Sequence, residues 1–160
     1  MTATVTSSSL VAVLEACWNA IRVRHSELPE VVIVVASGSG ERARRLTLGH
    51  FAPDRWEVRG DNRHEIMIGG EGLKRGAVDV LGTLLHEAAH AVAVVRGMQD
   101  TSRGGRYHNR RFKAIAEELG LAIGVDRSTR LEPDHGPGRD TARLRRRARS
   151  AERCAGPLAP

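Results

Sequence analysis

Hydrophobic residues recur at helical spacing in three stretches of the chain. Apolar positions three and four residues apart predict amphipathic helices near residues 10–25, 76–96 and 107–119. Gly97 and Gly120 directly follow the second and third stretches, as glycine commonly does just beyond the end of a helix. We therefore expect three helices, each with one apolar face turned toward a shared core.

Short runs with strand-like composition lie between the first two helices. Turn-forming residues at 53–54 and 60–62 interrupt these runs. The tight connections favour a small sheet of three to four strands that is mainly antiparallel, and with the helices they predict an α+β fold. The predicted strands cover residues 31–36, 46–51, 55–58 and 64–68.

The second predicted helix carries the sequence His-Glu-Ala-Ala-His at residues 86–90. Because residues four apart lie on one face of a helix, His86 and His90 can offer ring nitrogens to the same metal ion. Glu87 lies beside the first histidine, where it can reach a water on that metal, as in zinc peptidases. Apolar residues on both sides of the motif predict a buried helix, in which unpaired charge is costly.

A catalytic zinc site needs a third protein ligand, and the sequence offers three candidates. The extended peptidase pattern that continues after the motif is excluded, because Ala93 replaces its glycine and Arg96 its last histidine. His108 lies at the start of the third predicted helix, with Asn109 or His108 near the N-cap, after a loop that can reverse the chain. Glu117 and Glu118 lie further along that helix, and either would complete a site of two histidines and one glutamate.

Basic charge is concentrated toward the end of the chain. The protein has 160 residues and a formal net charge of +6. Residues 126–160 hold nine Lys or Arg against five Asp or Glu, and they show no apolar periodicity. We therefore expect a flexible N-terminus at 1–8, one domain at 9–125 and a disordered basic tail at 126–160. The charge of the tail suits a polyanion such as DNA.

Several other classes of protein do not fit the sequence. Cys17 and Cys154 lack paired spacing, which argues against a disulfide framework and a cysteine-rich zinc ribbon. The Gly-Ser-Gly turn at 38–40 lacks the later glycines and the lysine of a phosphate-binding loop. No basic segment precedes an apolar one at the N-terminus, and no apolar run approaches about 20 residues. We expect a cytoplasmic protein that makes no membrane contact.

The region around the histidines resembles the SprT-like metallopeptidase family, which includes Spartan, a protease that removes proteins crosslinked to DNA. The resemblance extends over residues 81–121 and implies a zincin-like core, with an active-site helix followed by a ligand-bearing helix. It implies that Glu87 is the catalytic base and that the zinc ligands are His86, His90 and His108. The matching residues are Leu84-Leu85-His86-Glu87, His90, His108, Phe112-Lys113 and Ala116-Glu117-Glu118-Leu119-Gly120.

The resemblance implies hydrolysis of peptide bonds by a zinc-activated water, from which Glu87 takes a proton. Tyr107 and Arg106, beside the third histidine, are candidates for stabilising the oxyanion. The expected partners are a protein or peptide substrate and DNA bound by the basic tail, and the sequence indicates no oligomeric state. Two alternatives stay open: a DNA-binding module with a structural zinc site, and a soluble domain without metal.

Overall fold

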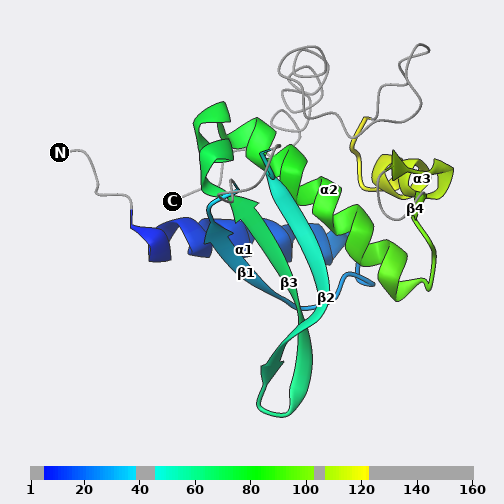
Figure 1. Ribbon diagram of the computed structural model, residues 1–160, viewed down its shortest axis with the longest axis horizontal. Helices are drawn as coiled ribbons and strands as arrows, with labels where there is room; N and C mark the ends of the chain where they lie inside the picture. The colour runs from blue at the N-terminus through cyan, green and yellow to red at the C-terminus, as the bar shows by residue number, and fades with distance from the viewer. Residues whose placement is uncertain (1–5, 39–45, 103–106, 123–160) are drawn as a thin grey trace, which may run out of the picture.

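The computed structural model describes residues 6–38, 46–102 and 107–122 of the chain. These residues form a mixed structure of helices and strands, which confirms the α+β prediction (Figure 1). The predicted basic tail at 126–160 lies outside the described residues. In chain order the elements are α1 (Ser7–Arg24), β1 (Val31–Ala36), β2 (Gly49–Val58), β3 (Asp61–Gly69), the 3-10 helix η1 (Gly70–Arg75), α2 (Ala77–Val95), β4 (Thr101–Ser102), β5 (Tyr107–His108) and α3 (Arg110–Glu118).

Helix α1 begins at Ser7, earlier than the predicted start near Leu10. Thr6 is its N-cap: the Thr6 side chain accepts from the backbone N–H of Ser9, and the Ser9 hydroxyl accepts from the backbone N–H of Thr6. This reciprocal pair is a capping box, which satisfies two backbone donors at once. The helix starts earlier than the apolar pattern predicts because its first turn, Ser7 to Ser9, is polar, and Ser9 closes the capping box from within the helix.

The sheet has three strands in the order β1-β3-β2 (Figure 1). Strand β2 pairs with β3 in antiparallel fashion, but β1 pairs with β3 in parallel. The prediction of a mainly antiparallel sheet is therefore confirmed only in part, since the pairing of β1 with β3 is parallel. The reason is topological: after β1 the chain first forms the edge strand β2, and the hairpin then returns β3 into the space between them.

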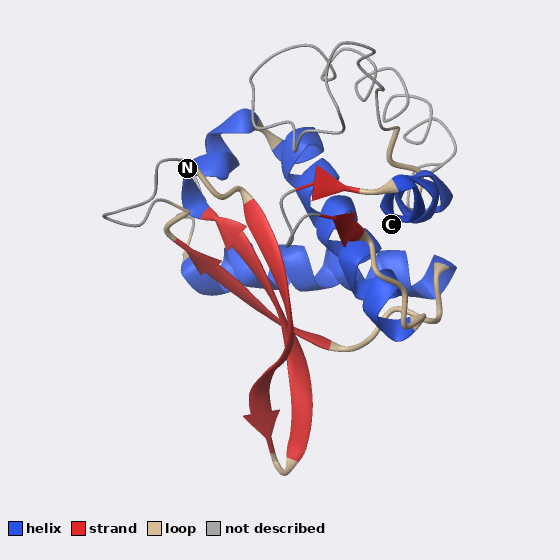
Figure 2. Cartoon of the chain, turned by 45° about the vertical axis from the view of Figure 1, so that its right-hand side comes forward, coloured by secondary structure: helices blue, strands red, loops and turns tan. Residues whose placement is uncertain are grey.

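Strand β2 is continuous through the predicted turn at Pro53 and Asp54. Its register with β3 shifts between Ala52 and Trp56, and Asp54 has a φ of 51°, so the strand contains an irregularity of the bulge type. The reversal comes later, at Arg59-Gly60, where both φ angles are positive as in a type I′ turn. The resulting hairpin projects beyond the helices (Figures 1 and 2).

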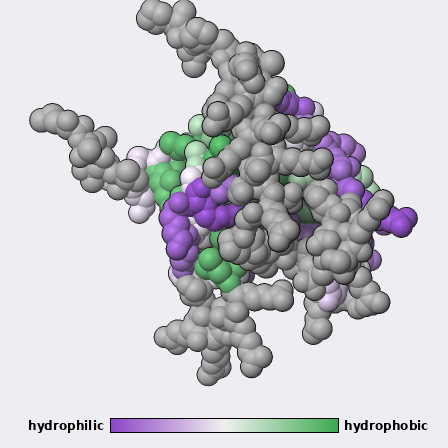
Figure 3. Space-filling view, turned by 90° about the horizontal axis from the view of Figure 1, so that it is seen from above, coloured by the Kyte–Doolittle hydropathy of each residue, from purple (hydrophilic) through white to green (hydrophobic). Residues whose placement is uncertain are grey.

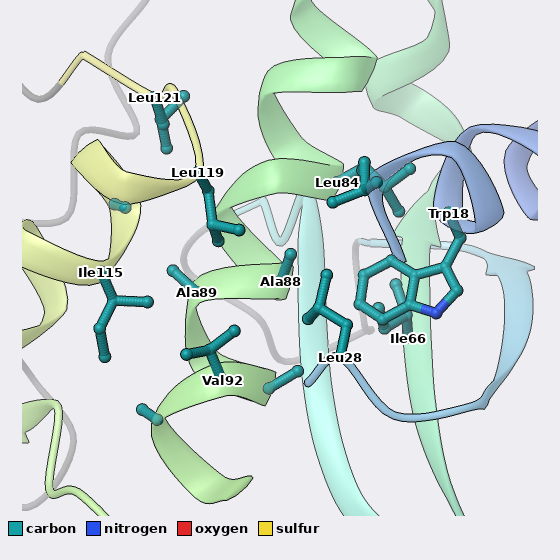
Figure 4. Packing of buried hydrophobic residues seen from close by; sticks show 14 of the residues in the cluster. Trp18, Leu28, Ile66, Leu84, Ala88, Ala89, Val92, Ile115, Leu119 and Leu121 are labelled. Atoms are coloured by element: carbon teal, nitrogen blue, oxygen red, sulfur yellow. The ribbon is translucent and has the colours of Figure 1, made fainter. Parts of the chain in front are cut away.

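Helix α2 lies in the middle of the hydrophobic core. Leu84 and Ala88 on one side of the helix face Trp18 of α1, while Ala89 on the other side faces Ile115 of α3 (Figure 4). All five side chains are almost fully buried. Alanine at the two facing positions lets neighbouring elements approach α2 closely from both sides, which brings the sheet and α3 to the same helix.

The predicted stops of α2 and α3 are confirmed. Gly97 has a φ of 60°, its N–H bonds to the carbonyl of Val94, and the N–H of Met98 bonds to the carbonyl of Ala93. Gly120, with a φ of 87°, ends α3 with the same kind of pairing. This is the Schellman motif, in which a left-handed residue, most often glycine, reverses the chain direction.

By length and composition alone, α2 is apolar enough to cross a membrane. The sequence pattern missed this because His86, Glu87 and His90 interrupt the apolar run. Eight residues of α2 are buried within the protein's own core, which is the usual environment of such a helix in a folded domain. The same test is passed by core helices, so it does not identify a membrane span.

Exposed hydrophobic side chains are distributed over several elements rather than one. Seen from above, hydrophobic and hydrophilic side chains of the described residues lie next to each other (Figure 3). Scattered exposure of this kind is ordinary for a protein surface. The large hydrophobic residues with exposed side chains are Val13, Val23, Leu46, Trp56, Val58, Leu81, Val94 and Val95.

Candidate metal centre

Three histidines converge beside α2. His86 and His90 lie one turn apart on the helix, and His108 reaches them from β5. One ring nitrogen from each lies within 4.8 Å of the others. The Nε2 atoms of His90 and His108 are 3.1 Å apart, although 18 residues separate them in the sequence.

The donor set fits a metal ion. Neutral imidazole is a common zinc ligand, and three histidines are one of the ligand sets of catalytic zinc sites. Two nitrogens bound about 2 Å from one tetrahedral ion would lie about 3.3 Å apart, close to the separation of the His90 and His108 nitrogens. The three histidines are therefore close enough together to bind one ion.

The sequence predicted that His108 lies at the start of the third helix, with Asn109 or His108 near the N-cap. Asn109 is the N-cap, but His108 itself lies just outside the helix. It lies in the two-residue strand β5, which pairs with β4 so that His108 is opposite Thr101. Helix α3 begins only after the N-cap Asn109, whose side chain accepts from the N–H groups of Arg111 and Phe112. The difference arises because a two-residue strand is too short to show an alternating pattern.

Phe112 of α3 packs against all three imidazole rings. Its ring centroid lies 3.9 Å from that of His108, with the planes only 24° apart, and 4.7 and 4.8 Å from those of His90 and His86. The phenyl ring is buried. It therefore forms an apolar wall that limits how the rings can turn and keeps solvent from one side of the cluster.

Asp100 is a member of the site that sequence reasoning missed. Its Oδ2 atom lies 2.5 Å from Nδ1 of His90. Burial raises the pKa of the Asp100 carboxyl, but the hydrogen bond and charge of His90 outweigh burial and hold the pKa below its ordinary value. A carboxylate on the outer ring nitrogen fixes the tautomer of a metal-binding histidine, leaving Nε2 free to coordinate. The sequence spacing does not predict that Asp100 contacts His90, because Asp100 lies in a loop without regular periodicity.

Glu87 is buried on the side of α2 that faces β2. Its exposed fraction is 4%. Burial raises the pKa of Glu87 to about 7, and the charge of His90 and a hydrogen bond from the backbone of Phe51 oppose that rise. A carboxyl with this pKa can both accept and donate a proton near neutral pH.

Gly49 allows β2 to approach Glu87. A Cβ atom at this position would lie 2.7 Å from Cγ2 of Thr83 and 3.0 Å from Oε1 of Glu87. Both distances are shorter than ordinary van der Waals contact, so a larger residue would force the strand and helix apart. Gly49 is thus a second residue of the site that the sequence analysis did not identify.

The two glutamates that were alternative third ligands lie elsewhere. Glu118 pairs with Arg96 at 2.8 Å, and Glu117 lies 3.8 Å from Lys113. Both carboxylates are about half exposed. Among the described residues, the histidine cluster contains neither of them, which leaves His108 as the third member.

The two candidates for oxyanion stabilisation are only partly described. Tyr107 directly precedes His108 in β5, and its carbonyl oxygen accepts from the Ser102 hydroxyl at 3.4 Å. Arg106 lies outside the described residues, as does Cys154. The role of Tyr107 therefore stays a prediction.

Comparison with protein-family models, with curated proteins and with solved structures finds no significant match to this chain. The resemblance to SprT-like metallopeptidases accordingly stays a prediction from the motif.

Proposed function

We propose that this protein is a zinc-dependent peptidase of the SprT-like type, built on a zincin-like core. One observation carries the proposal: His108 of β5 joins two histidines of α2, and the residue next to the first of these two, Glu87, is a buried glutamate. Imidazole nitrogens suit zinc, and a carboxyl next to the first ligand suits general-base catalysis. Both features come from the five residues 86–90 and His108.

In this proposal His86, His90 and His108 hold the zinc ion through ring nitrogens. Zinc bound there would supply a Lewis acid and lower the pKa of a bound water toward about 7. Glu87 accepts a proton from the attacking water and later donates it to the leaving amine. The N–H of Phe51 orients the Glu87 carboxylate, and Asp100 orients His90.

The proposed substrate is a protein or peptide, and the proposed second partner is DNA held by residues 126–160. The tail's nine basic residues support this, because contacts with phosphates are made by Lys and Arg and weaken steeply with salt. A DNA-binding module with a structural zinc site is the alternative. That alternative leaves the buried carboxylate of Glu87 without a role.

The test begins with metal content. Purified full-length protein is expected to bind one equivalent of zinc, and His108→Ala is expected to lose it. Glu87→Gln should keep the zinc while its rate of cleaving DNA-bound or free unfolded proteins falls about 10²- to 10⁴-fold, the usual contribution of a general base. Glu117→Gln is the matched control, because this half-exposed glutamate on α3 lies outside the cluster.

Two results would contradict the proposal. Wild-type protein without stoichiometric metal would remove the metal site itself. Full activity in a zinc-loaded Glu87→Gln variant would remove the assigned base while leaving the metal site in place.

A further inference from the structure

Asn109 makes hydrogen bonds in two directions between the histidine-bearing segments. Its side-chain oxygen accepts from the backbone N–H groups of Arg111 and Phe112, at 2.8 and 3.1 Å. Its side-chain nitrogen donates to the carbonyl oxygens of Gln99, at 2.7 Å, and Thr101, at 3.5 Å. Because the oxygen and the nitrogen have different kinds of partner, the amide has a single favourable orientation.

These bonds enclose Asp100, the carboxylate that contacts His90. The backbone N–H of Asn109 donates to the carbonyl oxygen of Asp100 at 2.8 Å. Together with the side-chain bonds, it holds the three successive carbonyls of residues 99–101. The carboxylate of Asp100 reaches Nδ1 of His90 from this fixed backbone. His108 directly precedes Asn109, so the same residue also anchors the third histidine.

Backbone pairing alone gives this region little support. Strands β4 and β5 share only two registered pairs. A ladder this short is marginal without side-chain contacts. Among the residues that the structure describes, the hydrogen bonds of Asn109 add a polar link between the loop that carries Asp100 and the start of α3.

We propose that Asn109 is a positioning residue of the metal centre, holding Asp100 against His90 and His108 in place at the same time. This inference rests on the proposed metal site. It extends that site by assigning a residue that touches neither the metal nor the substrate. Loss of such outer partners typically lowers metal affinity about 10- to 100-fold.

The competing explanation is that Asn109 only caps α3. Serine, aspartate and asparagine are similarly good N-cap residues, so Asn109→Ser and Asn109→Asp both keep the cap. An ionised aspartate has no donor for the Gln99 carbonyl and would face that oxygen with a negative charge. Serine is too short to cap the helix and reach Gln99 at once. The two variants therefore remove the bond to the loop while preserving the cap.

The experiment measures binding of Zn²⁺ and Co²⁺ to the full-length protein by competition with a chelator, together with the visible spectrum of bound Co²⁺. Both Asn109 variants are expected to bind about 10- to 100-fold more weakly than wild type. The Co²⁺ spectrum should change while the far-UV circular dichroism stays the same. Thr6→Ala is the matched control: it removes the cap of α1, and it should lower stability without changing metal affinity or the spectrum.

A second measurement tests whether Asn109 affects metal binding by holding Asp100. If Asn109 acts by holding Asp100, Asn109→Ser costs less metal affinity in an Asp100→Asn background than in wild type. Equal losses in the two backgrounds would overturn that path.

The remaining outcomes separate this inference from the proposed function. Wild-type affinity and an unchanged Co²⁺ spectrum in both Asn109 variants would overturn the positioning role while the metal site stands. A wild-type protein that binds no stoichiometric metal would overturn the metal site and the positioning role together.

Discussion

The part of the chain that the structure describes contains two antiparallel strand pairs, which differ in length. Strands β2 and β3 form a long hairpin with a glycine-containing turn, and seven registered pairs hold its two arms together. Strands β4 and β5 share only two registered pairs. Yet His108, the histidine that completes the cluster, lies in the short pair. One of the three candidate metal ligands thus lies where backbone pairing contributes least, while His86 and His90 lie on the long helix α2.

The difference shows where each hairpin gets its stability. The long hairpin is held by its own backbone ladder and by packing against α2. The short pair is held from outside, by Asn109 and by the packing of Phe112 against His108. Changes to the long hairpin should therefore affect folding, whereas changes to the short pair should affect metal binding.

Gly49 is where the long hairpin meets the site, so its substitution should have the largest effect among the hairpin changes. In Gly49→Ala the new Cβ would press on Thr83 and Glu87. Overpacking of this kind costs about 1–3 kcal/mol of unfolding free energy, measurable by urea denaturation. Proteolytic activity should fall as well, because the strand contacts the proposed base.

Two further variants sharpen this prediction. Gly70→Ala is the control, since its Cβ would make only an ordinary contact, 3.6 Å from the carbonyl oxygen of Ala36. Adding Thr83→Ser to Gly49→Ala removes the clashing methyl group and keeps the hydroxyl that bonds to Asp79, so part of the stability should return. If Gly49→Ala is as stable as wild type, the close approach of β2 to α2 is not required.

Features that depend on neighbouring residues could be predicted from the sequence, whereas features that depend on contacts between distant segments could not. The spacing of His86 and His90 and the glycines after α2 and α3 are local signals, and the structure bears them out. The parallel pairing of β1 with β3 is not local, because it depends on where the chain crosses the sheet. The sequence pattern predicted neither the contact of Asp100 with His90 nor the position of His108 in a strand. Both depend on how the loop after α2 is oriented in the folded protein, and that orientation produces no periodic spacing in the sequence.

Trp56 tests whether the outer half of the long hairpin is independent of the site. Its indole N–H donates to the buried carboxylate of Glu65 at 2.8 Å. Trp56→Phe removes this donor and should cost about 1 kcal/mol in urea unfolding. Zinc affinity should stay at the wild-type value. Val58→Ala, at an exposed position of the same strand, is the control and should change neither quantity. Weakened zinc binding in Trp56→Phe would show that the two regions are coupled after all.

Arg96 should give the smallest effect, although it joins three segments near the site. Its guanidinium bonds to both carboxylate oxygens of Glu27 and to Glu118, and the bonds to Glu27 lower the pKa of that carboxyl. The pairs are partly exposed, so Arg96→Ala should cost about 1 kcal/mol or less, and less still at high salt. Lys113→Ala, which removes a looser pair on α3, is the control.

Because Asn109 rather than Arg96 is proposed to hold the loop after α2, zinc affinity should not change in Arg96→Ala. A loss of zinc affinity in Arg96→Ala as large as that in Asn109→Ser would mean that the docking of α2 on α3 holds the short strand pair, and that Asn109 does not.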